Sequence, residues 1–182
     1  MEKPQIVKPE VFVGDILTAK ADAIVALPGV SLGGRDLSGE LMKKAGLERM
    51  PECAAGRALA LPAGGLDAKW LILGKAVPLG DGQNKELLPF AEAMRACLEL
   101  VREKEIETAA FASFPTAEYG SRLFSVLGAV WRPIMDLKRE QGLPKRTLIV
   151  CQNEEIARHY RVVYNYWYAI DKSDRLDDPG WD

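Results

Sequence analysis

The sequence has few of the residues that build metal centres and disulfide frameworks. Its 182 residues include one histidine, His159, and three cysteines, Cys53, Cys97 and Cys151, which are far apart in the chain. With no Cys-x-x-Cys pair and a single histidine, we expect neither a zinc framework nor a histidine-rich metal site. An odd, sparse set of cysteines is typical of reduced thiols, so we expect a cytoplasmic protein without a metal.

Long apolar runs and an excess of charge of one sign are also missing. The longest stretch without a charged side chain, residues 23–34, contains Pro28 and Gly29 and is too short to span a bilayer. No apolar core of a secretory signal follows residues 1–4. Lys and Arg number 24 against 26 Asp and Glu, which leaves a net charge of −2. This balance gives no reason to expect binding to a membrane or to nucleic acid.

The standard nucleotide-binding motifs are absent as well. The chain contains no Gly-x-x-x-x-Gly-Lys-Ser/Thr run, and no Gly-x-Gly-x-x-Gly follows a predicted strand. The sequence therefore predicts neither a P-loop nor a dinucleotide fingerprint, and no cofactor is expected.

What the sequence does contain is an alternation of short apolar runs with longer stretches of helical period. The short runs predict one or two strands over residues 5–13, which Pro9 interrupts, and further strands over residues 23–27, 70–73, 108–111 and 146–151. The apolar stripes predict helices over residues 87–104, 121–139 and 154–168. Asn153 is the expected cap of the last helix, and Pro133 predicts a kink or a break in the middle one. A shorter helix is predicted from a Ser38 cap to Ala45, ended by Gly46.

This alternation predicts an α/β sandwich with a mostly parallel central sheet. The length favours one domain, which we place at residues 1–170. Residues 171–182 follow as an acidic C-terminal tail, with five aspartates and only Leu176 and Trp181 as large apolar side chains. We expect this tail to be a surface extension.

Ligands of such sheets bind in the loops at the carboxyl ends of the strands. Two glycine-containing loops lie there, each between a predicted buried strand and a helix: residues 33–38 and residues 116–120. A pyrophosphate needs several backbone N–H groups that converge at glycine turns and helix N-termini. The two loops together fit that requirement.

The order of the motifs resembles the macro domain, an ADP-ribose-binding α/β module. Gly14-Asp15-Ile16 matches the family's Gly-Asp-Ile turn, and residues 22–25 match its Asp-Ala-Ile-Val strand. A glycine-rich turn, a short helix ending in Ala45-Gly46, and the loop from Thr116 to Gly120 follow in the family's order. The resemblance covers roughly residues 11–168, and it implies a three-layer α/β/α macro-like fold.

The resemblance also implies a ligand, ADP-ribose or a related nucleotide, and a set of residues that contact it. Asp15 would accept a hydrogen bond from the adenine amino group, the Ile16 backbone would help fix the base, and Tyr119 would border the ribose and diphosphate. The ligand-binding residues that it implies are Asp15, Ile16, Gly33, Gly34, Arg35, Leu37, Thr116, Ala117, Glu118, Tyr119 and Gly120.

The chain departs from the family at positions that matter for catalysis. Where the family has Asn-Ala-Ala-Asn, this chain has residues 26–29 as Ala-Leu-Pro-Gly, so Ala26 and Gly29 replace both asparagines. We therefore predict binding without catalysis and name no catalytic residue. One alternative is an interaction or oligomerisation module with a degenerate pocket, which would be compatible with a homo-oligomer. The other is a hydrolase of ADP-ribosylated substrates in which Asp36 replaces the asparagines.

Overall fold

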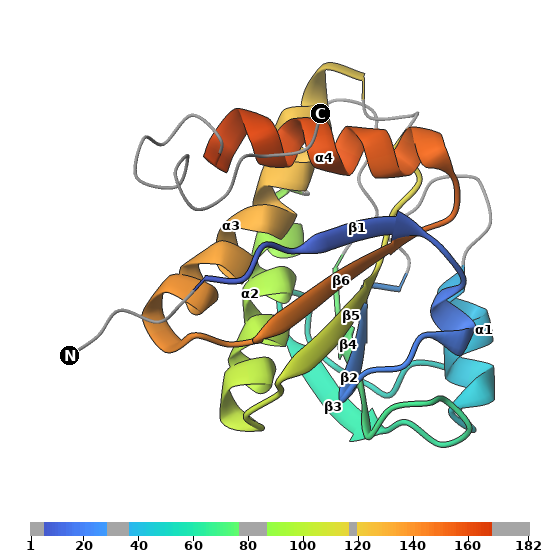
Figure 1. The fold of residues 1–182 in the computed structure, drawn as a ribbon. Helices are drawn as coiled ribbons and strands as arrows, with labels where there is room; N and C mark the ends of the chain where they lie inside the picture. Colours follow the sequence, from blue (N-terminus) through green and yellow to red (C-terminus); the bar gives the residue numbers. More distant parts are fainter. Residues whose placement is uncertain (1–5, 29–36, 77–86, 117–119, 169–182) are drawn as a thin grey trace.

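The computed structural model describes residues 6–28, 37–76, 87–116 and 120–168. Strands and helices alternate along this part of the chain (Figure 1). The strands are β1 (Glu10–Val13), β2 (Ala23–Ala26), β3 (Ala58–Pro62), β4 (Trp70–Gly74), β5 (Thr108–Ala112) and β6 (Arg146–Cys151). The α-helices are α1 (Leu37–Lys44), α2 (Leu87–Glu103), α3 (Leu123–Gln141) and α4 (Glu154–Tyr168), and two 3₁₀ turns are η1 (Ile16–Thr18) and η3 (Gly120–Arg122).

The six strands form one mixed sheet in the order β1-β6-β5-β2-β4-β3. Every neighbouring pair is parallel except β3 with β4, which is antiparallel. β2 lies inside the sheet, where it pairs with β5 and β4, and all four of its residues are buried. Burial on both faces explains its unbroken apolar run. The predicted α/β/α fold with a mostly parallel mixed sheet is confirmed.

Alternate residues of the strands face two separate apolar clusters, because successive side chains of a strand point to opposite faces. Val25 belongs to the cluster that the sheet forms with α2, α3 and α4. Its neighbour Ile24 belongs to the cluster formed with Leu41 of α1 and Ile16 of η1. The sheet is thus covered by three helices on one face and by α1 and η1 on the other (Figure 1).

The helices on the first face match the predicted ranges within a few residues. α4 begins as expected after Asn153, whose Oδ1 accepts a hydrogen bond from Ile156 N at 2.9 Å. α3 continues through Pro133 to Gln141, so a break at this proline is wrong. A proline inside a helix costs about 3 kcal/mol. The buried Val130 and Ile134 beside it pack into the core and offset that cost.

The expectations for the start of α1 and for the number of strands need correction. Ser38 is not a helix cap, because α1 begins at Leu37 and Ser38 lies in its first turn. The Leu37 side chain is partly buried against the apolar cluster that contains Leu41 and Ile16, and this packing favours a helical conformation at residue 37. Gly46 ends the helix as expected, with φ +84°. The edge strand β3 is absent from the predicted strands, because its Ala-Leu-Ala-Leu-Pro sequence has little of the β-branched character typical of strands.

Among the described residues, no helix has the length and apolar character needed to cross a bilayer. The predicted acidic tail, residues 171–182, lies outside the described part of the chain. The domain boundary at residue 170 therefore stays a prediction.

Lys138 is a charged residue enclosed by the core side of α3, with 2% of its surface exposed. Its Nζ donates hydrogen bonds to the carbonyl oxygens of Pro144 at 2.6 Å and Lys145 at 3.4 Å. These bonds tie the end of α3 to the segment that leads into β6. Burial disfavours the charged ammonium and lowers the pKa of Lys138 to about 8.

This lowered pKa predicts a pH dependence of stability. The unfolded chain keeps the Lys138 proton up to about pH 10.5, whereas the folded chain releases it near pH 8, so stability rises with pH between these values. The free energy of unfolding of the parent, minus that of Lys138→Met, should increase by about 2 kcal/mol between pH 7 and pH 10. Urea unfolding at both pH values measures it. A difference that does not change with pH would show that Lys138 titrates alike in both states.

Candidate functional site

The carboxyl ends of five parallel strands meet at one edge of the sheet, because β1, β6, β5, β2 and β4 all run in the same direction. β2 and β5 are neighbours, yet β2 leads to α1 on one face of the sheet and β5 leads to α3 on the other. Where neighbouring strands send their connections to opposite faces, a crevice opens beyond their carboxyl ends, and ligands bind there. The topology therefore places the candidate site beyond β2 and β5.

Asp15 lies at this same edge, two residues after β1. Because β1 pairs in parallel with β6, Gly14 N continues the ladder by donating to Cys151 O at 3.0 Å. Asp15 is exposed and caps η1, with its Oδ1 accepting a hydrogen bond from Leu17 N at 2.9 Å. The cap fixes the orientation of the carboxylate, whose other oxygen, Oδ2, is also an acceptor. Asp15 is thus an oriented anionic acceptor at the carboxyl edge of the sheet.

The loop that follows β5 is tied to α4 by two hydrogen bonds. Phe114 N donates to the Tyr160 hydroxyl at 3.2 Å, in a buried contact. Thr116 Oγ1 lies 2.6 Å from His159 Nδ1, and Thr116 is 3% exposed. A hydroxyl both donates and accepts, so this pair forms with either tautomer of the ring. The Thr116 side chain is therefore used to hold the loop on α4.

This connection is the feature of the site that the sequence does not indicate. The position of His159 in the chain suggests a surface or helix-packing role, and the structure pairs it with Thr116. The two residues are 43 positions apart and belong to no local motif. Tyr160, the next residue, is itself fixed because its carbonyl accepts from Trp131 Nε1 at 3.0 Å.

The structure describes five of the eleven residues that the resemblance implies. Asp15 and Ile16 lie together after β1, with the Ile16 side chain buried beneath η1. Leu37 is the first residue of α1, Thr116 ends the described part of the loop after β5, and Gly120 begins η3 with φ +52°. The others, Gly33, Gly34, Arg35, Ala117, Glu118 and Tyr119, lie outside the described residues, as does Asp36.

The thiols near this edge are poor nucleophiles. Cys151, at the end of β6, is fully buried, and burial raises the pKa of its thiol to about 12. Cys97, a residue of α2, is buried in the core, and burial raises the pKa of its thiol too. No group of three or more His, Cys, Asp or Glu side chains within the described ranges could hold a metal ion. The described part of the edge offers hydrogen-bonding groups and a carboxylate.

A model of the macro-domain family matches residues 26–127 of the chain. The O-acetyl-ADP-ribose deacetylase of Salmonella gallinarum is 33% identical over 164 residues, which cover 83% of this chain and 90% of that protein. The chain belongs to the macro-domain family. A macro domain-containing protein of Methanosarcina mazei is 30% identical over 154 residues, 80% of this chain and 81% of that protein.

Solved macro domains have the same fold as this one. The Oceanobacillus iheyensis macrodomain with MES bound superposes with a TM-score of 0.69 at 21% identity, over 85% of this chain and 89% of that one. A point mutant of that macrodomain with ADPR gives the same TM-score at 22% identity, over 85% and 90% of the two chains. The family match runs from the last residue of β2 to the first turns of α3, so it includes the loops after β2 and β5.

The contact between the loop and α4 predicts an energetic coupling between Thr116 and His159. Thr116→Val keeps the side-chain volume but removes the hydroxyl, and His159→Ala removes the ring. In a double-mutant cycle measured by urea unfolding, the two substitutions should be coupled by about 0.5–1.5 kcal/mol, the net contribution of one hydrogen bond. If the changes in the free energy of unfolding of the two single variants add up to that of the double variant within about 0.3 kcal/mol, the pair does not hold the loop.

Proposed function

We propose that this macro domain binds ADP-ribose or a related adenine nucleotide in the crevice beyond β2 and β5, without chemical change to the ligand. The observation that carries the proposal is the oriented, exposed carboxylate of Asp15 at that edge. An adenine presents a 6-amino group, a hydrogen-bond donor that a carboxylate oxygen accepts. The loops after β2 and β5, each leading into a helix on a different face, are the parts suited to a diphosphate.

The relatives support this ligand. One solved structure with the same fold is a macrodomain mutant with ADPR, and another is a macrodomain with ADP. In this chain the base would lie near Asp15 and Ile16, and the diphosphate would lie toward Leu37 and Gly120 and the loops that precede them. Thr116 would contribute through its backbone, because its hydroxyl is used by His159.

Asp15→Ala tests the proposal by isothermal titration with ADP-ribose. A hydrogen bond to a charged group contributes about 1.5–3 kcal/mol, so the substitution should weaken binding by roughly 10- to 150-fold. The free energy of unfolding should fall by about 1 kcal/mol, the value of a lost cap. Unchanged affinity for ADP-ribose in Asp15→Ala, or no binding by the parent chain, would reject the proposal.

Asp15→Asn is the matched variant that separates base recognition from the cap. Asparagine caps a helix as well as aspartate does. If the asparagine carbonyl oxygen accepts from Leu17 N, as Asp15 Oδ1 does, the side-chain NH₂ faces the base. The NH₂ and the adenine 6-amino group are both donors, so no hydrogen bond forms between them. The variant should lose affinity for ADP-ribose and gain affinity for the hypoxanthine analogue, which has a carbonyl at that position. Equal losses for both ligands would mean that Asp15 does not read the base.

A second candidate function is hydrolysis of O-acetyl-ADP-ribose. It is favoured by the name of the relatives, O-acetyl-ADP-ribose deacetylase, which match this chain over 90% of their length. At the end of β2, however, Ala26 and Leu27 are buried apolar residues with no group to position water. Catalysis would then depend on Asp36 in the loop that follows.

Incubation with O-acetyl-ADP-ribose distinguishes the two candidates. Our proposal predicts that the parent chain binds the compound but releases no acetate above the uncatalysed rate, since Ala26 and Gly29 supply no acid, base or water-positioning group. Chromatography of the nucleotide products over time measures it. Turnover that is lost in Asp36→Ala would establish the hydrolase instead.

A further inference from the structure

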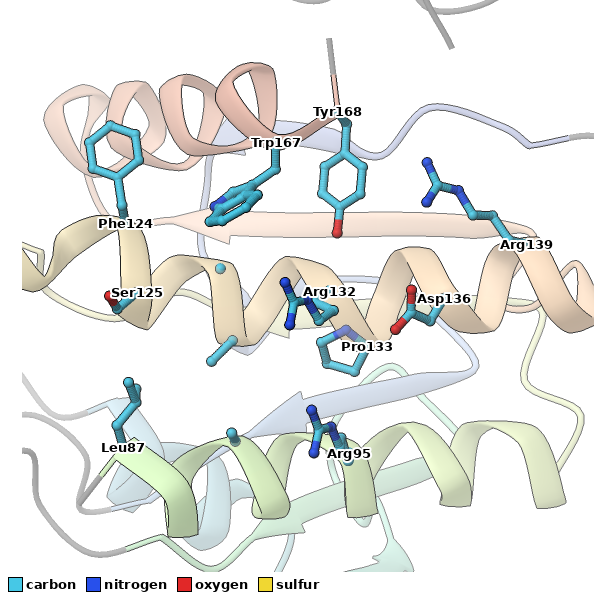
Figure 2. A pocket seen from close by; sticks show the side chains of 13 residues that line it. Leu87, Arg95, Phe124, Ser125, Arg132, Pro133, Asp136, Arg139, Trp167 and Tyr168 are labelled. Carbon is cyan, nitrogen blue, oxygen red and sulfur yellow. The ribbon is translucent and has the colours of Figure 1, made fainter. Parts of the chain in front are cut away.

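A groove lies on the outer side of the three-helix face, away from the sheet. It runs between α2 and α3 below the end of α4, and it encloses about 400 Å³. We call it the α2–α3 groove; its lining includes Leu87, Arg95, Phe124, Arg132, Asp136 and Trp167. Figure 2 shows Trp167 and Tyr168 pointing from α4 toward α3, with Arg95 pointing from α2 toward the same space. Of the residues that the structure describes, none in the loops of the candidate site lines it.

The groove combines apolar and cationic walls. Phe124 is 38% exposed and Trp167 is 44% exposed, although both are large apolar side chains. Arg132 lies 5.8 Å from the centre of the Trp167 ring, and the groove is also lined by Arg95 and Arg139. Among the described lining residues, Asp136 is the one acidic side chain against three arginines, so their net charge is positive. Such a surface fits an acidic segment that carries an apolar anchor.

We propose that the acidic segment of this same chain, residues 169–182, folds back and occupies the α2–α3 groove. The segment begins directly after Tyr168, which lines the groove. It contains five aspartates against Lys172 and Arg175, and its apolar residues include Leu176 and Trp181. The charge of the segment is thus opposite to that of the groove, and an indole is available for the apolar wall.

The length of the segment is sufficient. Its 14 residues span up to about 46–50 Å when extended, at about 3.3–3.6 Å per residue. The groove follows α3 from Phe124 to Arg139, which is about 22 Å at 1.5 Å per residue. Because the segment is tethered to the groove directly after Tyr168, its effective concentration there is of the order of millimolar, and weak contacts are enough to hold it.

Charges around the groove also restrict where the segment lies. A smaller hollow adjoins the groove between α2 and α3, and its lining adds Glu99 and Glu140 to Arg95 and Asp136. These carboxylates would repel an acidic segment. The aspartates are therefore placed on the Arg95 and Arg132 side of Asp136, with Trp181 against the exposed aromatic residues.

The test is a paramagnetic label on the segment of the full chain. Gly180→Cys, combined with Cys53→Ser, places a nitroxide beside Trp181 and leaves every aspartate in place; Cys97 and Cys151 are buried and escape labelling. Amide signals of α2 and α3 at Ala91 and Gly128 should lose intensity, and those of α1 on the opposite face should keep it. Uniform loss, or loss centred on α1, would overturn the proposal.

Charge reversal supplies the specific control. Arg95→Glu with Arg132→Glu should restore the signals of the groove, because the aspartates are then repelled. Lys43→Glu with Arg49→Glu changes the net charge equally at exposed positions outside the groove and should leave the signals broadened. Salt at about 1 M, where the Debye length is about 3 Å, should also restore them. Signals that respond equally to both charge reversals would contradict the proposal.

Two further measurements test the role of Trp181 and whether the segment docks on its own chain. Trp181→Ser changes only the segment and leaves the groove residues as they are, and it should restore the signals as well if the indole is the anchor. In a mixture of ¹⁵N-labelled chain without the nitroxide and unlabelled chain with it, no signal should be lost. Loss of intensity in this mixture would show that the segment occupies a second copy, which would overturn docking within one chain.

Discussion

The parallel pairing of β2 with β5 is the constraint on which the candidate site depends. The register Val25↔Phe111 brings the ends of two strands together although they are more than 80 residues apart in the chain. Because α1 and α3 then lie on opposite faces, the two connections leave the sheet toward opposite faces, the arrangement in which ligands of such sheets bind beyond the carboxyl ends of the strands. Ala109 and Ala110 of β5 are small and fully buried, one in each apolar cluster, so helices pack closely on both faces of this strand.

Much of this fold could be predicted from the sequence, since its signals are local. The apolar run at residues 23–27 and the stripe at residues 154–168 predict β2 and α4 at nearly their observed bounds. Elements that form because of their tertiary neighbours could not be predicted from local patterns. β3 has alanine at every second position and forms because β4 offers an edge, and Pro133 is tolerated inside α3 because its neighbours are buried.

The candidate site could be predicted in part, for a similar reason. Gly14-Asp15-Ile16 is a contiguous motif, so a resemblance could identify it, and the structure adds that the carboxylate caps η1. The bond between Thr116 and His159 joins distant segments and depends on how α4 packs beside β6. The periodicity of apolar residues therefore could not predict this hydrogen bond. Its consequence is that the loop after β5 is fixed by α4, on the face that also carries the α2–α3 groove.

The proposed ligand position at the carboxyl edge of the sheet can be tested by titrating the ¹⁵N-labelled chain with ADP-ribose. Amide shifts should change at residues 14–17 and 113–116, which follow β1 and β5 at that edge. Amides at the opposite edge, such as those of Asp22 and Thr108, should not change. Shifts confined to the α2–α3 groove or to the opposite edge, or no shifts at all, would contradict this ligand position.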